Sequence, residues 1–332
     1  MRTAWHGESN ISSWEVWTEV RKRWKYGICL LICLLMLLLG GCGAAKTPAD
    51  EASSSAPAAA SAGAAAAQGK IVIKMLDVGQ GDAILIRTAE QTVLVDTSDV
   101  DERDKLRAQL AQAGVKKIDK VILTHPHADH IGGMDVLLDG SFEIGAIYDN
   151  GMPSTSKLYL GYLKKAKAKG IAHHALKAGD VLDFGDGAQF KVLSPQESLV
   201  QKGQQKGYKH DPNNESVVGK LTFGKFSMLF TGDAEKEAEA TIAAQFGSEL
   251  KSQVLKSPHH GSKTSSSAAY LRLVQPEVCL ISCGAGNDYG HPHKETLKKY
   301  QALHAKVYET DKNGTITVTS DGTGYEVKEE KT

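Results

Sequence analysis

Three histidines and an aspartate lie close together in the stretch from His125 to His130 (HPHADH). Imidazole nitrogens and carboxylate oxygens are ligands that zinc and similar divalent ions accept readily. We predict that His125 and His127 bind one ion, while Asp129 and His130 face a second ion. The glycine pair at 132–133 would let the following segment approach this site closely, because glycine has no Cβ atom.

The motif follows the apolar run Val121–Leu123, which is typical of a buried strand, and we expect a strand over Lys120–Leu123. The end of this strand would project the histidines into one loop. Other candidate site residues also follow strand-like runs: Asp96 follows 92–95, Asp233 follows 226–231, and His259-His260 follow 253–255.

Strand-like and helix-like stretches alternate over residues 70–319. Further strands are expected at 70–76, 83–87, 144–148, 181–184, 189–193, 217–223, 278–283, 306–309 and 314–319. Helices are expected at 101–113, 156–169, 234–246, 264–274 and 294–304, and a polar loop at 196–215. Two strand-rich halves, each with helices, predict an α/β protein with a four-layer αββα sandwich.

Four further segments, taken together with the histidine motif, resemble the motifs of a known family. They are Asp77–Asp82 (DVGQGD), Thr231–Asp233 (TGD), His259–Ser262 (HHGS) and Tyr289–Pro292 (YGHP). Together these motifs resemble the metallo-β-lactamase superfamily of metal-dependent hydrolases, and more narrowly the hydrolase domain of ComEC-type competence proteins. The resemblance covers about residues 70–328. It implies one metallo-hydrolase domain of the metallo-β-lactamase-like sandwich type, with the metal ligands in loops at one edge of the two sheets.

The resemblance also implies individual roles. Asp233 would be the carboxylate that bridges two metal ions, although it could instead be the N-cap of a helix beginning at Ala234. One of His259 and His260 would complete the second ion's ligands, and the sequence does not say which. Asp96 would accept a hydrogen bond from a ligand histidine and fix its tautomer; the alternative is an ordinary turn aspartate.

One motif departs from the superfamily pattern. Many members have a third histidine for the first ion where this chain has the stretch 211–218 (DPNNESVV). His210 lies nearby, but at the wrong offset. The first ion would then be held by fewer groups and exchange more readily, so that both zinc and manganese remain open. Asn213 or Asn214 is expected to bond a metal-bound water or a phosphoryl oxygen, unless turn chemistry explains the pair.

The predicted catalytic residues are Asp129, Asn214 and His291. His291 lies in a glycine-bounded loop before a helix, and it is a candidate either for the acid that protonates the leaving group or for a phosphate contact. Asp82 ends a glycine-rich turn, and it could be a turn residue or a site residue.

Residues 1–41 are predicted to be a signal peptide, because residues 21–42 have its typical features. A basic cluster at 21–25 precedes the apolar run Ile28–Leu39, which is short for a membrane span. The run ends in Gly40-Gly41-Cys42, which resembles a bacterial lipoprotein cleavage site. Cys42 would then carry a lipid anchor and hold the protein at the extracytoplasmic face of the membrane; an uncleaved N-terminal anchor is the alternative.

The segments on either side of this signal differ in kind. Residues 1–20 fit a signal peptide poorly, and we hypothesise that translation begins near Val16 or Val20. Residues 42–69 are dominated by alanine and serine, which cannot bury a core and predict a flexible tether.

The composition sets further limits. Lysine and arginine number 39, as do aspartate and glutamate, so the bulk charge does not favour a nucleic-acid partner. Lysines at 164–169 and 202–209 could supply a local basic face, or could simply be solvated. Cys279 and Cys283 are predicted to be buried free thiols, because their spacing on one strand does not suit a disulfide.

The motifs therefore predict a metal-dependent hydrolase with two divalent ions, Zn or Mn, that activate a water molecule. Phosphodiesters suit two cations best, because their charge needs neutralising. The first hypothesis is a membrane-tethered phosphodiesterase or nuclease acting on DNA. The second is an esterase for a cell-envelope phosphodiester, such as a choline-phosphate or teichoic-acid ester. The third is a catalytically silent binding lipoprotein. No protein partner is inferred.

Overall fold

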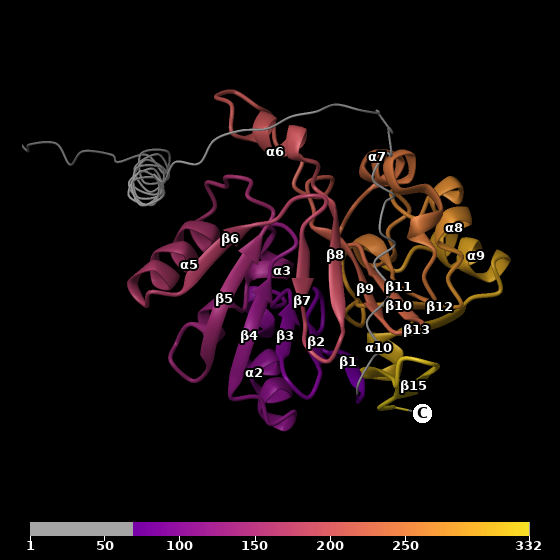
Figure 1. Cartoon of the computed structure of the whole chain (residues 1–332), viewed down its shortest axis with the longest axis horizontal. Coiled ribbons are helices and arrows are strands. Elements are labelled where there is room, and N and C mark those ends of the chain that lie inside the picture. The colour runs from indigo at the N-terminus through magenta and orange to yellow at the C-terminus, as the bar shows by residue number, and fades with distance from the viewer. Residues whose placement is uncertain (1–68, 332) are drawn as a thin grey trace, which may run out of the picture. The chain divides into compact units, whose positions relative to one another are not determined.

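The computed structural model describes residues 69–331, which form two β-sheets with helices on their outer faces (Figure 1). Cys42, the signal peptide 1–41 and all but the last residue of the tether 42–69 lie outside the described residues. Within the described residues, the first sheet has eight strands in the order β15-β14-β1-β2-β3-β4-β5-β6. Its strands are β1 (Ile71–Met75), β2 (Ile84–Arg87), β3 (Thr92–Val95), β4 (Lys117–Ile122), β5 (Glu143–Asp149), β6 (Ala172–Ala175), β14 (Ile316–Ser320) and β15 (Tyr325–Glu329).

The second sheet has seven strands within the described part of the chain, in the order β13-β12-β11-β10-β9-β8-β7. Its strands are β7 (Val181–Asp183), β8 (Gln189–Ser194), β9 (Val218–Phe223), β10 (Phe226–Phe230), β11 (Val254–Lys256), β12 (Val278–Ile281) and β13 (Lys306–Glu309). The longer helices are α2 (Arg103–Gln112), α5 (Lys157–Ala168), α7 (Lys236–Phe246), α8 (Ala268–Val274) and α9 (Lys294–Ala302).

Three apolar clusters make this a four-layer structure. One cluster joins the two sheets face to face, with Ile73 and Val93 from the first sheet and Phe190 and Met228 from the second. A second cluster packs α2 and α5 on the outer face of the first sheet. A third packs α7, α8 and α9 on the outer face of the second sheet, at the right in Figure 1. The αββα sandwich predicted from the sequence is therefore confirmed.

Some predicted elements differ from the observed ones. The loop expected at 196–215 contains a short helix, α6 (Glu197–Gly203), and strands β6 and β15 were not predicted. The sequence of β6, AHHA, is poor in the apolar residues that indicate a strand, and all four residues are at least partly exposed. The helix expected from 264 begins only at Ala268, where the Ser267 hydroxyl caps it by accepting a hydrogen bond from the Tyr270 amide.

The strand directions create one functional edge. Strands β3 to β6 are parallel to one another, and so are β10 to β13. The predicted metal ligands follow the carboxyl ends of β4, β10 and β11. Strand β1 is antiparallel to β2, and β2 is antiparallel to β3, so β1 runs in the same direction as β3. Met75 therefore lies near the edge that carries the site, and Ile71 lies at the opposite edge. No helix in the described chain is both long and apolar enough to span a bilayer.

Cys279 and Cys283 are buried and free, as predicted. Burial raises the pKa of both thiols.

Candidate metal centre

The loop after β4 is fixed by Asp96, the residue that follows β3. The Asp96 backbone adopts a left-handed φ of 59°, which aspartate tolerates better than most residues. Its amide donates to the Ile122 carbonyl at 2.8 Å. Its carboxylate accepts hydrogen bonds from the Thr124 amide at 2.7 Å, the Thr124 hydroxyl at 2.8 Å and His130 Nδ1 at 2.8 Å. Asp96 thus orients the ring of His130.

A short helix, α3 (Ala128–Ile131), follows the first histidines and turns the chain back into the protein. Its surroundings leave no room for side chains at three glycines. A Cβ on Gly132 would lie 2.3 Å from the Val100 amide nitrogen, and one on Gly133 would lie 2.1 Å from the Thr97 carbonyl oxygen. A Cβ on Gly81 would lie 2.3 Å from the Asp129 carbonyl oxygen. The close approach expected at 132–133 is therefore present.

Four side chains converge at the edge between the two sheets: Asp129, His130, Asp233 and His260. We call them the four-ligand cluster. His130 Nε2 lies 3.3 Å from Asp233 Oδ2 and 3.7 Å from Asp129 Oδ2. His260 Nε2 lies 3.5 Å and 3.2 Å from the same two oxygens. Of the two adjacent histidines that the sequence could not distinguish, His260 is the one placed in this cluster.

Hydrogen bonds from the far side of each ring determine which histidine nitrogen faces the cluster. His260 Nδ1 lies 2.9 Å from the Ser282 carbonyl oxygen, which can only accept, so Nδ1 carries a proton. His130 Nδ1 is bonded to Asp96 in the same manner. In a neutral ring, the Nε2 atoms of both histidines are then lone-pair donors that point at Asp129 and Asp233, as metal ligation requires.

His125 and His127 form a second group beside the cluster. His125 Nε2 lies 3.0 Å from His127 Nδ1 and 3.9 Å from Asp233 Oδ2. His125 Nδ1 is 3.1 Å from the Thr124 hydroxyl and 3.4 Å from the Ser216 hydroxyl. His125 is buried, whereas His127 is exposed. This group therefore faces solvent more openly than the four-ligand cluster does.

The charges in the cluster are strongly coupled. Burial alone would raise the pKa of Asp233, but the charges of His130 and His260 hold it well below its usual range. Burial alone would lower the pKa of His260, but the nearby carboxylates of Asp233 and Asp82 raise it to about 10. The histidine protons thus balance the carboxylates, and a cation that binds here must displace them.

A buried ion pair between Lys256 and Asp82 lies beneath the cluster. Asp82 was a candidate from the sequence, but Lys256 was not. Lys256, the last residue of β11, is only 1% exposed and pairs with Asp82. Its Nζ atom lies 3.9 Å from Asp233 Oδ1 and donates to the Gly232 carbonyl at 3.3 Å. Asp82 is also 3.6 Å from His260 Nδ1, so it is a site residue and not only a turn residue. A lysine inside an otherwise apolar strand, VLK, was the available signal.

His259 and His291 lie on the solvent side of the cluster. Both histidines of the pair 259–260 have φ near +50°, which directs the two rings apart. His259 Nε2 is 3.7 Å from Asp233 Oδ2, and its Nδ1 is 3.1 Å from Glu235 Oε1. The His291 ring centroid lies 5.5 Å from that of His259 and 6.1 Å from that of His260. Burial and these neighbouring histidines lower the pKa of His291 to about 4.

Asn214 does not point into the cluster. Its side-chain oxygen accepts hydrogen bonds from the amides of Glu235 and Ala238 at 3.2 and 3.1 Å, so Asn214 caps α7. The alternative that made Asp233 the cap of this helix is wrong, because α7 begins at Lys236. Asn213 donates to Glu235 at 3.2 Å. His210 is paired with Glu215.

The donor set fits a divalent cation. Among the described residues, His130 Nε2, Asp82 Oδ1 and Asp233 Oδ1 are buried atoms without a hydrogen-bond partner. Buried polar atoms are nearly always paired, so such a group indicates a missing ligand. The distances between donors, 3.2 to 3.7 Å, also match ligands that surround one ion at about 2.1 Å.

Comparisons with known proteins agree with this site. The sequence profile of the Metallo-beta-lactamase superfamily matches residues 76–285. The chain therefore belongs to the metallo-β-lactamase superfamily of metal-dependent hydrolases.

The predicted resemblance to competence proteins is also confirmed. The chain is 35% identical to ComE operon protein 3 of Bacillus subtilis over 74% of its length and 32% of that protein. It is 32% identical to Competence protein ComA of Neisseria gonorrhoeae, over 75% of this chain and 32% of the relative. It thus spans about a third of the length of these relatives. A solved diphosphatase of the PhnP family aligns at 16% identity and a TM-score of 0.44, over 75% of this chain and 98% of that one.

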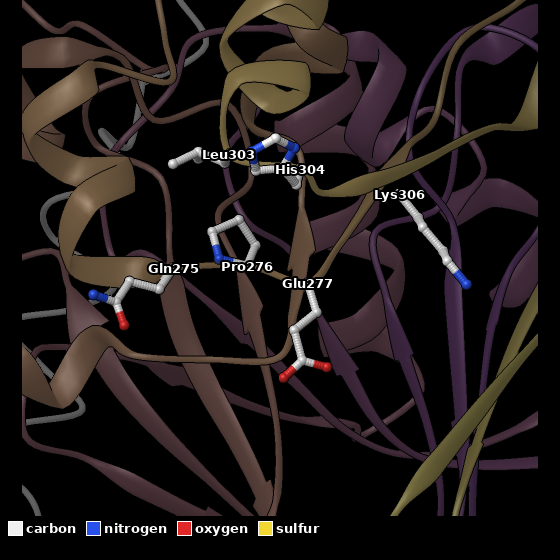
Figure 2. Close-up of a pocket in the computed structure, with 6 residues that line it drawn as sticks. All are labelled: Gln275, Pro276, Glu277, Leu303, His304 and Lys306. Atoms are coloured by element: carbon white, nitrogen blue, oxygen red, sulfur yellow. The ribbon is translucent and has the colours of Figure 1, made fainter.

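A separate hollow of about 530 Å³ lies far from these residues. Figure 2 shows its lining, which includes Glu277, His304 and Lys306. Glu277 precedes β12 and Lys306 begins β13, so the hollow is at the amino ends of the strands. The four-ligand cluster lies beyond their carboxyl ends, and the hollow is therefore not part of the candidate site.

Proposed function

We propose that this chain is a metal-dependent phosphodiesterase that cleaves DNA, held at the extracytoplasmic face of the membrane by a lipid anchor at Cys42. The observation that carries the proposal is the four-ligand cluster with His125 and His127 beside it. This arrangement offers nitrogen and oxygen donors for two cations, zinc or manganese, around one carboxylate, Asp233. The names of relatives support DNA as the substrate: two are competence proteins, and one from Haemophilus influenzae, 29% identical, is called Recombination protein 2.

Two divalent cations bound here would lower the pKa of a water molecule and neutralise charge on a phosphodiester. Other residues of the chain hold the candidate metal ligands in position. Asp96 and the Ser282 carbonyl hold the rings of His130 and His260, so that the ligand geometry is fixed before substrate binds. Preorganised groups of this kind need no rearrangement during the reaction.

The lowered pKa of His291 supports one of its two predicted roles. With a pKa near 4, the ring is neutral at pH 7 and has little acid form to protonate a leaving group. A neutral imidazole can still donate one N–H hydrogen bond to a phosphoryl oxygen. We therefore assign His291 to substrate phosphate binding.

The experiment is a substrate panel with the full chain. It would use plasmid and single-stranded DNA, bis-p-nitrophenyl phosphate, p-nitrophenyl-phosphorylcholine and a β-lactam, with Mn²⁺, Zn²⁺ or EDTA. We expect DNA cleavage with Mn²⁺ or Zn²⁺ that is lost in EDTA and in His127→Ala. The matched control is His304→Ala, since His304 is an exposed histidine in the hollow of Figure 2.

The other outcomes would replace the proposal. Cleavage of the choline ester alone would indicate an envelope phosphodiester as substrate. A folded protein that binds metal but cleaves nothing in the panel would indicate a binding protein.

A further inference from the structure

An exposed aromatic side chain stands at the rim of the metal centre. Three large apolar side chains are exposed among the described residues: Leu160, Val181 and Tyr289. Leu160 lies on α5, and Val181 begins β7, the edge strand that is three strands from β10. Tyr289 is the most exposed of the three, at 65%, and lies two residues before His291. An aromatic ring beside such a site can stack on a planar ligand.

The loop that carries Tyr289 is fixed by a side chain. The Asn287 side-chain amide donates to the Gly284 carbonyl at 2.9 Å and to the His291 carbonyl at 2.7 Å. Its oxygen accepts a hydrogen bond from the His291 amide at 3.0 Å. The loop turns at Gly290, where φ is +68°. Asn287 therefore braces both ends of the segment, and Tyr289 is presented on a defined loop.

The ring of Tyr289 continues a row of rings that begins at the cluster. His260 and His291 are stacked, with centroids 6.1 Å apart and planes at 26°. His291 and Tyr289 are stacked in turn, with centroids 5.6 Å apart and planes at 20°. Tyr289 thus packs one side against His291, and its high exposure leaves the other side in water. The outer end of the row is a flat aromatic surface, two rings from a metal ligand.

We propose that Tyr289 is a stacking platform for an unpaired nucleobase of a single-stranded substrate whose phosphodiester lies at the cluster. The inference rests on the proposed function and names the form of nucleic acid that the site prefers. Every base offers a flat face, so stacking on tyrosine is independent of sequence. In a duplex that face is covered by the next base pair, so the platform selects single strands. Lys263, exposed on the same rim beside His293, can attract the backbone phosphates.

A single open ring favours a base over the choline group of an envelope ester. Quaternary ammonium groups are recognised by cages of several aromatic rings. Tyr289 is stacked on a histidine and offers one free side, which suits a planar partner.

The test is binding of the full chain to a short fluorescein-labelled oligothymidylate, followed by anisotropy in EDTA so that no strand is cut. We expect Tyr289→Ala to weaken binding about 5- to 150-fold, the range found when one base–aromatic stack is removed. Tyr289→Phe keeps the ring and should bind as the natural protein does. Val181→Ala, at an exposed apolar position on the edge strand β7, is the matched control.

A second measurement uses oligothymidylates with one abasic site at successive positions. For the natural protein, one position should cost most of the affinity, and Tyr289→Ala should be insensitive at that position. Equal affinity of Tyr289→Ala and the natural protein, or no binding by either, would overturn the platform. So would a raised KM of Tyr289→Ala for p-nitrophenyl-phosphorylcholine with unchanged oligonucleotide affinity. Hydrolysis of bis-p-nitrophenyl phosphate by the natural protein reports separately on the proposed function.

Discussion

Two groups of histidine and aspartate can be compared: the four-ligand cluster, and Asp149 at the end of β5 with His173 in β6. They differ in how their polar atoms are used. In the four-ligand cluster, His130 Nε2 and Asp233 Oδ1 are buried without a hydrogen-bond partner among the described residues. The carboxylate of Asp149, the last residue of β5, is also buried, but it accepts three hydrogen bonds. They come from the Gly151 amide, the Tyr162 hydroxyl and His173 Nε2, at 2.9, 2.9 and 2.8 Å.

The difference shows that residue types alone do not define a metal centre. Adjacent histidines occur twice in the chain, at 173–174 and at 259–260. In the first pair, His173 binds a carboxylate that is already satisfied, and His174 stacks on Tyr148. In the second pair, His260 directs its Nε2 atom at two carboxylates, those of Asp129 and Asp233. A site for a cation requires several donors that converge and remain unsatisfied.

The largest expected effect comes from removing the central carboxylate. Asp233→Asn removes a negative charge that faces both the rest of the four-ligand cluster and His125, so we expect loss of tightly bound Mn²⁺ or Zn²⁺. Phosphodiester hydrolysis should fall by about a thousandfold or more, since metal ions contribute several kcal/mol to such reactions. Asp149→Asn is the matched change in the other group and should keep its metal. Equal metal content in the two variants, by elemental analysis, would break the comparison.

A second effect concerns the charge beneath the cluster. Lys256→Met leaves Asp82 and Asp233 without their buried cation, and breaking such a pair typically costs about 3–5 kcal/mol. We expect the loss in unfolding free energy to be largest in EDTA and smaller with saturating Mn²⁺, because the metal supplies positive charge. The control is Lys165→Met, whose surface pair with Asp135 should contribute less than about 1 kcal/mol. Urea unfolding measures both; identical losses with and without Mn²⁺ would contradict the expectation.

The third change loosens the support of one ligand. Asp96→Asn keeps the shape of the side chain but weakens the hydrogen bond that orients His130. Losses of about 10- to 100-fold in metal affinity are typical when such a partner is replaced. Competition with a chelator of known affinity would measure the change. An unaltered affinity would mean that packing alone fixes the His130 ring.

The smallest expected effect concerns the stability contributed by the pair of Asp149 and His173. Burial alone would lower the pKa of His173, but Asp149 raises it above the ordinary value of 6.5. The protonated ring therefore stabilises the fold fully below pH 6.5, and this contribution is lost as the pH rises through the raised pKa. The stability difference between the natural protein and His173→Gln should shrink over that range. Denaturant unfolding at several pH values tests this, and a difference that grows with pH would be contrary to it.

Much of the fold was predictable because its strands are apolar and their turns are marked. Runs such as 226–231 and 278–283 are buried almost completely and gave clear strand patterns. β6 and the start of α8 were not predictable in this manner. The exposed strand β6 forms because β5 offers it a free edge, and α8 begins where Ser267 can cap it. Both depend on neighbours in space.

The site shows the same division. The positions of His125 to His130 follow from one loop, so spacing alone could indicate them. Choosing His260 over His259 required the backbone turn at Pro258–Gly261, which separates the two rings. Asn214 was assigned to the site because asparagine suits several roles, whereas its hydrogen bonds place it at the start of α7. Lys256 was missed because a buried lysine is rare and its partner, Asp82, is 174 positions earlier in the chain.

The course of β1 has a consequence for any segment joined before it. Its five residues span about 16 Å, and they begin at the sheet edge remote from the metal ligands and end beside them. Any segment that precedes residue 69 is thus joined to the described chain at the sheet edge opposite the candidate metal centre. Exchanging that segment for another should therefore leave turnover unaltered.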